Sequence, residues 1–179
     1  MRQALIAMGL GGALATAGAF IAPIETGPDG PQLQPYADLG GVATYCYGET
    51  SRPVKDSYTE EECLARFAQS LQEHWDGIEL FIPTDAPESV KAAMLSVAYN
   101  VGVDGWKYEL DEEGKRRPSR FRVALAQGDW SSACALITAP WQGKHGVSQG
   151  YKATVRGEPV RGLENRRKAE EVLCRTDLY

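Results

Sequence analysis

The chain has 179 residues, of which 43% are hydrophobic and 24% are charged. This size and composition fit one globular domain of about 150 residues with a short additional segment, and they exclude large-scale disorder. The formal net charge is −5, and the densest basic stretch, Lys115–Arg117, lies close behind three acidic residues, so we expect no binding to nucleic acid.

An uncharged segment runs from Ala4 to Ile24 near the N-terminus, and its 21 residues include seven Ala and four Gly. As one helix it would be about 31 Å long, which is enough to cross a bilayer, although small residues bury little apolar area in lipid. Arg2 before the segment and Glu25 after it predict a cytoplasmic N-terminus and an exported remainder. We therefore divide the chain into an export segment, residues 1–25, and a domain, residues 26–179.

Three alternatives for the export segment stay open. A small-x-small sequence such as Ala15-Thr16-Ala17 is typical of a cleaved signal peptide. The segment could also be a permanent anchor, or an anchor helix that later leaves the membrane. The many Gly and Ala residues, and the lack of a spacer before the first polar motif, favour the releasing anchor.

The domain begins with turn-forming and strand-forming residues. Pro23 and the turn residues 27–31 are expected to end the N-terminal helix. Residues 36–48 combine Val, Thr and Tyr with three glycines, and this composition predicts a short β-hairpin. Thr59 followed by Glu62 forms a capping box, which predicts that a helix begins there.

Helical periodicity then alternates with polar stretches. The helix that begins after Thr59 is predicted to end near Gly77, and a buried helix follows that Ser89 caps and that ends near Gly102. An exposed loop over residues 104–118 leads to a short helix over Phe121–Gln127, which Gly128 ends. Asp129 caps the next helix, a loop covers residues 139–162, and a last helix covers Leu163–Leu173. The predicted class is therefore α+β and mainly helical.

Four cysteines lie outside the apolar segment: Cys46, Cys63, Cys134 and Cys174. An even number of cysteines in an exported chain indicates disulfides. Of the three possible pairings we favour Cys46–Cys63 and Cys134–Cys174, because each pair is close enough in sequence to staple one half of a two-part domain. Each bond would stabilise the fold by about 3–4 kcal/mol. A zinc site is the alternative, but no CxxC motif occurs and the chain has 2 histidines, so we expect no metal and no other cofactor.

Two carboxylates and a hydroxyl stand at a defined spacing behind the apolar segment. Eight residues separate Asp29 from Asp38, and five separate Asp38 from Thr44. Hydrolysis of a glycosidic bond needs a proton donor and a carboxylate that positions water or stabilises positive charge, and these residue types supply both. The stretch is therefore a candidate active site.

The spacing resembles the Glu–x8–Asp–x5–Thr signature of the phage-type lysozymes, glycoside hydrolase family 24. Four further motifs occur in the same order as in that family: Tyr36-Ala37-Asp38, Tyr99-Asn100-Val101-Gly102, Gly128-Asp129-Trp130, and Gly162-Leu163 with Arg166, Arg167 and Glu170. The resemblance covers roughly residues 29–174, which is nearly the whole domain. The apolar leader and the four cysteines resemble the signal-arrest-release endolysins of lambdoid phages.

The resemblance implies a fold of two lobes: a small lobe that contains the β element and a larger helical lobe, joined by a helix. It implies a muramidase that hydrolyses the β-1,4 bond between N-acetylmuramic acid and N-acetylglucosamine in bacterial peptidoglycan, for host-cell lysis. The implied partners are peptidoglycan and, through the N-terminal segment, the host inner membrane. We expect a monomer that is found first in that membrane, with its N-terminus in the cytoplasm, and then in the periplasm.

Carried over to this sequence, the family's general acid falls on Asp29, its second carboxylate on Asp38 and its water-positioning hydroxyl on Thr44. Tyr36 and Asn100 match motif positions and are expected to support substrate binding. Asp29 departs from the family, which has Glu there. Because Asp is one methylene shorter, its carboxyl is withdrawn by roughly 1.5 Å, and a misplacement of about 1 Å can cost on the order of 100-fold in rate.

Two glutamates bear on this departure. Glu49 stands where many family members have His, and our hypothesis is that it lies against the substrate and supplies part of the missing acid function. Glu25, four residues before Asp29, is interpreted as a solvated residue of the turn that follows the apolar segment. Two other functions stay open: a catalytically impaired lysozyme-like module that binds peptidoglycan or a partner, and an unrelated exported helical domain held by disulfides.

Overall fold

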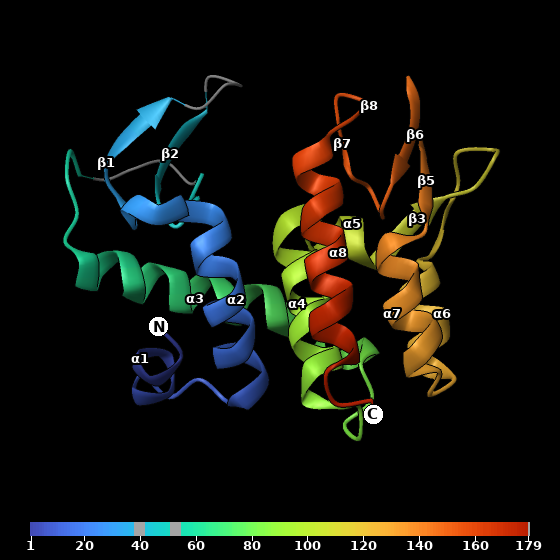
Figure 1. The fold of residues 1–179 in the computed structure, drawn as a ribbon, viewed down its shortest axis with the longest axis horizontal. Helices are drawn as coiled ribbons and strands as arrows, with labels where there is room; N and C mark the ends of the chain where they lie inside the picture. Colours follow the sequence, from blue (N-terminus) through green and yellow to red (C-terminus); the bar gives the residue numbers. More distant parts are fainter. Residues whose placement is uncertain (38–41, 51–54, 179) are drawn as a thin grey trace. The chain divides into compact units, whose positions relative to one another are not determined.

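The computed structural model describes residues 1–37, 42–50 and 55–178, and the chain forms two compact units, Met1–Glu73 and His74–Tyr179. Helices predominate, and the described strands form four separate antiparallel pairs (Figure 1). One helix, α3 (Glu60–Ile78), runs from the first unit into the second. The mainly helical α+β class predicted from the sequence is confirmed.

The uncharged N-terminal segment forms two helices, where its sequence predicts a single one. α1 (Arg2–Ala7) and α2 (Gly12–Thr26) are separated by a turn in which Gly9 has a φ of 90°. Glycine adopts a positive φ at little cost, and this conformation interrupts the helix. Within the described ranges, no helix is both long enough and apolar enough to cross a membrane.

α2 packs through small residues against its neighbours in the first unit. Ala15 and Ile21 are fully buried. At Gly18 an added Cβ atom would lie 2.4 Å from Leu5 Cδ1 of α1 and 2.8 Å from Leu71 Cδ1 of α3. Such distances are far below van der Waals contact, so the absence of a side chain at this position lets the three helices approach closely.

Pro23 lies inside α2 and does not end it, so that part of the prediction is wrong. Proline removes one backbone hydrogen bond here, and the helix continues to Thr26, whose Oγ1 donates to the Ala22 carbonyl at 3.0 Å. The helix ends before Gly27, which has a φ of 64°. The boundary that we drew between residues 25 and 26 falls within this helix.

Enlarging residue 18 should destabilise the protein. We expect Gly18→Leu to lower the free energy of unfolding by about 1–3 kcal/mol, because the new side chain overpacks the contact among α1, α2 and α3. Urea unfolding of the full chain would measure the change, with Ala7→Leu at an exposed position of α1 as the control. Equal midpoints for the two variants would contradict the packing described for α2.

The hairpin and the start of α3 form where the sequence predicts them. β1 (Gln32–Ala37) pairs antiparallel with β2 (Ala43–Cys46). At the start of α3, the Glu62 amide donates to Thr59 Oγ1 at 3.1 Å, and the Thr59 amide donates to the Glu62 carboxylate at 3.0 Å. Both halves of the capping box are therefore made. α3 ends at Ile78, and the 3-10 turn η2 (Glu79–Phe81) follows.

The second unit is built around α4 (Glu88–Val101), which is the buried central helix that the sequence predicts. Residues 92–98 of α4 are all buried. The helices α7 (Trp130–Thr138) and α8 (Arg161–Arg175) pack against it, and α6 (Arg120–Ala126) packs against α7.

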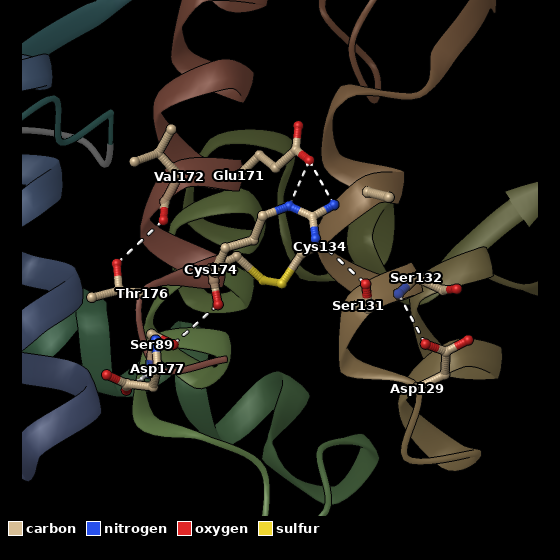
Figure 2. Close-up of a disulfide and its surroundings, with 12 residues drawn as sticks. Ser89, Asp129, Ser131, Ser132, Cys134, Glu171, Val172, Cys174, Thr176 and Asp177 are labelled. Atoms are coloured by element: carbon tan, nitrogen blue, oxygen red, sulfur yellow. Dashed lines mark hydrogen bonds and ion pairs between the residues drawn. A yellow bond between two sulfur atoms is a disulfide. The ribbon is translucent and has the colours of Figure 1, made fainter. Parts of the chain in front are cut away.

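Ser89 does not cap α4, contrary to the prediction. Its amide donates to the Asp177 carboxylate at 2.9 Å, and its Oγ donates to the Cys174 carbonyl at 3.0 Å (Figure 2). The cap of α4 thus comes from the far end of the chain, which no local pattern can show. The predicted cap of α7 is confirmed, since Asp129 accepts a hydrogen bond from the Ser132 amide at 3.0 Å.

The structure contains the two disulfides that the sequence spacing favours. Cys46–Cys63 joins β2 to α3 in the first unit, and Cys134–Cys174 joins α7 to α8 in the second (Figure 2). The paired cysteines are 17 and 40 residues apart in sequence. Each bond therefore lies within one unit.

The loops predicted over residues 104–118 and 139–162 are wrong, because short elements order both stretches. These elements are α5 (Val103–Lys107), β3 (Tyr108–Leu110), β4 (Arg116–Pro118), β5 (Pro140–Gly143), β6 (Gly146–Gln149), β7 (Thr154–Val155) and β8 (Glu158–Pro159). A fully buried aromatic residue anchors each stretch: Trp106 in the first and Tyr151 in the second. Their composition is polar, but tertiary contacts decide their structure.

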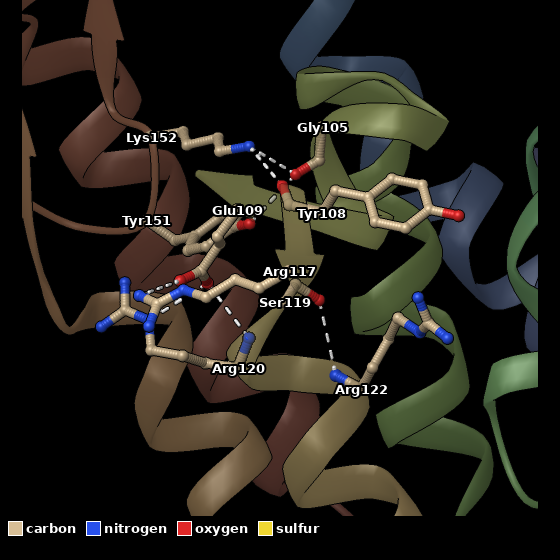
Figure 3. Close-up of polar contacts among 9 residues, drawn as sticks. All are labelled: Gly105, Tyr108, Glu109, Arg117, Ser119, Arg120, Arg122, Tyr151 and Lys152. Carbon is tan, nitrogen blue, oxygen red and sulfur yellow. Dashed lines mark hydrogen bonds and ion pairs between the residues drawn. The ribbon is translucent and has the colours of Figure 1, made fainter. Parts of the chain in front are cut away.

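Polar contacts hold the first stretch in place and link it to the second (Figure 3). The Glu109 side chain is 2% exposed, and its carboxylate accepts hydrogen bonds from the amide and Nε of Arg120, both at 3.1 Å. From the other stretch, Lys152 Nζ donates to the carbonyls of Gly105 at 2.6 Å and Tyr108 at 3.2 Å. These partners are far apart in sequence, which explains why local patterns miss the strands.

Candidate active site

Most of the site residues predicted from the sequence lie in the first unit: Asp29, Tyr36, Thr44 and Glu49. Asn100 lies in the second unit, and Asp38 lies outside the described residues. In the sequence, Asp38 follows directly after the last residue of β1.

Asp29 lies in an open turn. It is the last residue of η1 (Gly27–Asp29), a short 3-10 turn, and it is exposed. Gly27 and Gly30 on either side have φ values of 64° and 77°, and among the described residues a Cβ atom at either one would meet nothing within 4 Å. No described side chain therefore packs against these two glycines.

Tyr36 and Thr44 lie directly opposite each other on β1 and β2. Side chains of such cross-strand partners point to the same face of the sheet. Thr44 is 7% exposed, and its Oγ1 donates to the Val42 carbonyl at 3.2 Å, whereas Tyr36 is 47% exposed. The hairpin thus holds a fixed hydroxyl beside an accessible aromatic ring.

The turn that follows β2 is held rigidly. The Tyr45 amide donates to the Glu49 carbonyl at 3.0 Å, and the Glu49 amide donates back to the Tyr45 carbonyl at 2.9 Å. The ring of Tyr45 stacks on Tyr58 with ring centroids 4.7 Å apart. The disulfide at Cys46 fixes the same turn to α3. Within this turn Gly48 has a φ of 85°, a conformation that favours glycine.

Tyr47 belongs to the same turn and packs on α3. Its ring stacks on Phe67 with centroids 4.6 Å apart. Burial raises the pKa of the Tyr47 hydroxyl, and the negative charge of Glu60 raises it further. Tyr47 is therefore a neutral, structural part of the turn.

Glu25 contacts this turn, so its interpretation as a solvated residue is wrong. Glu25 is partly buried on the last turn of α2, and a Cβ atom at Gly48 would lie 3.0 Å from Glu25 Oε2. Helical spacing carried the signal that could have revealed this contact: Gly18, Ile21 and Ala22 lie on the packed face, and residue 25 follows them at i+7 from Gly18. Glu49 is the next residue after Gly48, and its Oε1 is buried.

Asn100 has a packing role in the second unit. Its Oδ1 accepts a hydrogen bond from the guanidinium of Arg167. Arg167 is fully buried and also donates through Nε to the Tyr151 carbonyl at 2.8 Å. Burial lowers the pKa of Arg167, and the neighbouring Glu170 carboxylate opposes this shift. The amide oxygen of Asn100 is therefore engaged inside this unit.

Known proteins resemble this chain along its length. The sequence matches the phage lysozyme family over residues 27–170. The SAR-endolysin of Bacteriophage PS34 is 35% identical over 182 residues, which cover 97% of this chain and 93% of that protein. The SAR-endolysin of Bacteriophage PS119 is 31% identical over the same coverage. Among solved structures, the active form of the P1 phage endolysin Lyz has a TM-score of 0.78 at 22% identity, covering 100% of this chain and 96% of that chain.

The family match covers well over half of the chain, and it includes the described hairpin with Tyr36 and Thr44 as well as α4 and most of α8. The curated relatives extend the likeness to the N-terminal helices, and the P1 phage structure shares the fold. The family and fold implied by the sequence motifs are both confirmed. The chain belongs to the phage lysozyme family, and it is a muramidase-type glycosidase that serves as an endolysin.

Proposed function

We propose that this endolysin hydrolyses the β-1,4 bond between N-acetylmuramic acid and N-acetylglucosamine in bacterial peptidoglycan with residues of its first unit. The pairing of Tyr36 with Thr44 supports the proposal. It fixes an accessible ring on β1 and a hydroxyl on β2, and Asp38 lies between these two strands in the sequence. Tyr36 and Glu49 would contact the sugar chain.

Each group has a chemical task. A carboxylic acid protonates the leaving glycosidic oxygen, and the Asp38 carboxylate stabilises positive charge or orients the attacking water. The Thr44 hydroxyl donates to the Val42 carbonyl, so its oxygen lone pairs are directed away from that bond and can accept a hydrogen bond from water. Two carboxyl groups are candidates for the acid: Asp29 at the end of η1, which has the spacing of the family signature, and Glu25 on the last turn of α2.

The role of Thr44 predicts a specific kinetic effect. We expect Thr44→Val to lower kcat on the order of 100-fold, because the same shape without a hydroxyl leaves the water misplaced. Steady-state release of reducing ends from peptidoglycan would measure kcat and KM. Thr50→Val, at an exposed position beyond the turn, is the matched control and should keep both constants. A Thr44→Val protein with the parent's kcat would rule out the water-positioning role.

The activity itself is tested with the full, oxidised chain. We expect the parent to release reducing ends from purified peptidoglycan and Asp38→Asn to release them at least 100-fold more slowly. Co-sedimentation with insoluble peptidoglycan gives binding separately. A parent chain that binds peptidoglycan and releases no reducing ends would instead be a binding module.

We further propose that the N-terminal segment carries the domain out through the host inner membrane and then leaves the membrane, so that a monomer acts in the periplasm. The uncharged residues 4–24 support export, and the curated SAR-endolysin relatives cover this part of the chain. Fractionation of expressing cells should show one full-length species in both the membrane and the soluble fractions. A single shortened soluble form would indicate a cleaved signal peptide.

A further inference from the structure

We propose that Glu25, on the last turn of α2, is the proton-donating acid of this endolysin, and that Asp29 is not. The proposal rests on the proposed muramidase activity and names the residue that performs one of its steps. The observation behind it is the position of the Glu25 carboxylate over Gly48, in the turn that continues directly from the strand bearing Thr44.

The Glu25 carboxylate packs closely against Gly48, next to the position that a side chain there would take. An added Cβ at this glycine would lie 3.0 Å from Glu25 Oε2, 3.6 Å from its Cδ and 3.8 Å from its Cβ. The turn itself is fixed by the paired hydrogen bonds between Tyr45 and Glu49 and by the Cys46–Cys63 disulfide. The carboxylate therefore lies against a fixed turn that follows Thr44 closely in the chain.

The backbone that carries Glu25 is also well fixed. Ile21, one helical turn earlier, is fully buried, and Gly18 packs against side chains of α1 and α3. A catalytic group on a packed helix keeps its position more accurately than one on an open turn. Asp29 is exposed on a turn between two glycines against which no described side chain packs, and its own side chain is one methylene shorter. Glu25 therefore combines a side chain of the length of the family's acid with a backbone that is held in place, and a proton donor needs both.

The chemical step balances with Glu25 as the acid. Its carboxyl proton passes to the glycosidic oxygen of the leaving N-acetylglucosamine, and the bond from that oxygen to C1 breaks with its electron pair on the oxygen. The oxygen of a water molecule forms the new bond to C1, and the proton of that water passes to the second carboxylate. Exchange with solvent then restores the proton on Glu25.

Three variants of the full, oxidised chain test the assignment: Glu25→Gln, Asp29→Asn and, as an exposed control on α3, Glu61→Gln. We expect Glu25→Gln to lower kcat by at least 100-fold with unchanged KM, unchanged co-sedimentation with peptidoglycan and an unchanged unfolding midpoint. Asp29→Asn should keep kcat within about threefold of the parent, since its carboxyl takes no part in proton transfer. A Glu25→Gln protein with more than a tenth of the parent's kcat, or an Asp29→Asn protein that loses as much as Glu25→Gln, overturns the assignment.

Gly48→Ala gives a second test that leaves every carboxyl group in place. The new methyl would make the Glu25 carboxylate give way by a few tenths of an ångström, so kcat should fall severalfold further than in Gly114→Ala, where φ is 77° and a Cβ meets no described atom within 4 Å. Equal losses in the two glycine variants would count against Glu25. If the parent chain itself releases no reducing ends, the muramidase proposal fails, whatever the variants do.

Discussion

Replacing Glu170 with Ala should lower the free energy of unfolding by about 3–5 kcal/mol, because the change leaves buried guanidinium charge without its carboxylate. Glu170 lies on α8 and is fully buried. Its carboxylate accepts hydrogen bonds from Arg166 Nε at 3.0 Å and from Ser96 Oγ of α4 at 2.7 Å, and it forms an ion pair with Arg167. Loss of this one group therefore disturbs the central contact between α4 and α8.

The neighbouring residue provides a matched control for this prediction. Glu171 pairs with Arg175 at 2.8 Å, and its side chain is 24% exposed. We expect Glu171→Ala to cost less than Glu170→Ala, since the Glu171 side chain is partly open to solvent, although it also accepts a hydrogen bond from Thr138 Oγ1 at 2.6 Å. Urea unfolding followed by circular dichroism would compare the two variants. Equal losses would show that burial does not decide the strength of these pairs.

Reduction of the disulfides should remove most of the stability of the fold. On the loop-entropy account, Cys46–Cys63 contributes about 3 kcal/mol for a separation of 17 residues and Cys134–Cys174 about 4 kcal/mol for 40. Because the whole stability of a domain is about 5–15 kcal/mol, their combined loss is a large share of it. We expect the urea midpoint to fall steeply in the presence of a thiol reductant.

Cysteine variants separate the two contributions. The double change Cys134→Ala with Cys174→Ala should destabilise the chain slightly more than Cys46→Ala with Cys63→Ala, since it opens the longer loop. The variants should be compared under oxidising conditions, with the reduced parent as the lower limit. A midpoint that does not respond to reductant would contradict a stabilising role for both bonds.

Local patterns were sufficient wherever the deciding contact lies within a few residues. The capping box of Thr59 and Glu62 and the cap at Asp129 each involve partners three residues apart, and both form as predicted. The hairpin around Tyr36 and Thr44 follows from its strand-forming residues and glycines. The motif spacing also identified the family, because several motifs occur in order along the chain.

Contacts between residues far apart in sequence determine the features that the sequence analysis did not predict. Asp177 replaces the expected cap of α4 from a position far along the chain. Buried Trp106 and Tyr151 order two polar stretches that read as loops. At the candidate site, the family spacing pointed to Asp29, whereas the position of Glu25 depends on how α2 packs against the turn at Gly48. The spacing of the family signature cannot show this contact, whereas the helical spacing from Gly18 places residue 25 on the packed face of α2.

The disulfide between α7 and α8 also bears on how the protein would survive proteolytic nicking. Lys144 is exposed in the turn between β5 and β6, and it lies between Cys134 and Cys174 in sequence. A trypsin-like protease that cuts after Lys144 would produce two fragments that the disulfide still joins. The nicked chain would migrate as a single band on a non-reducing gel and would separate only after reduction. An endolysin built in this way can tolerate one such cut in the second unit without releasing α8.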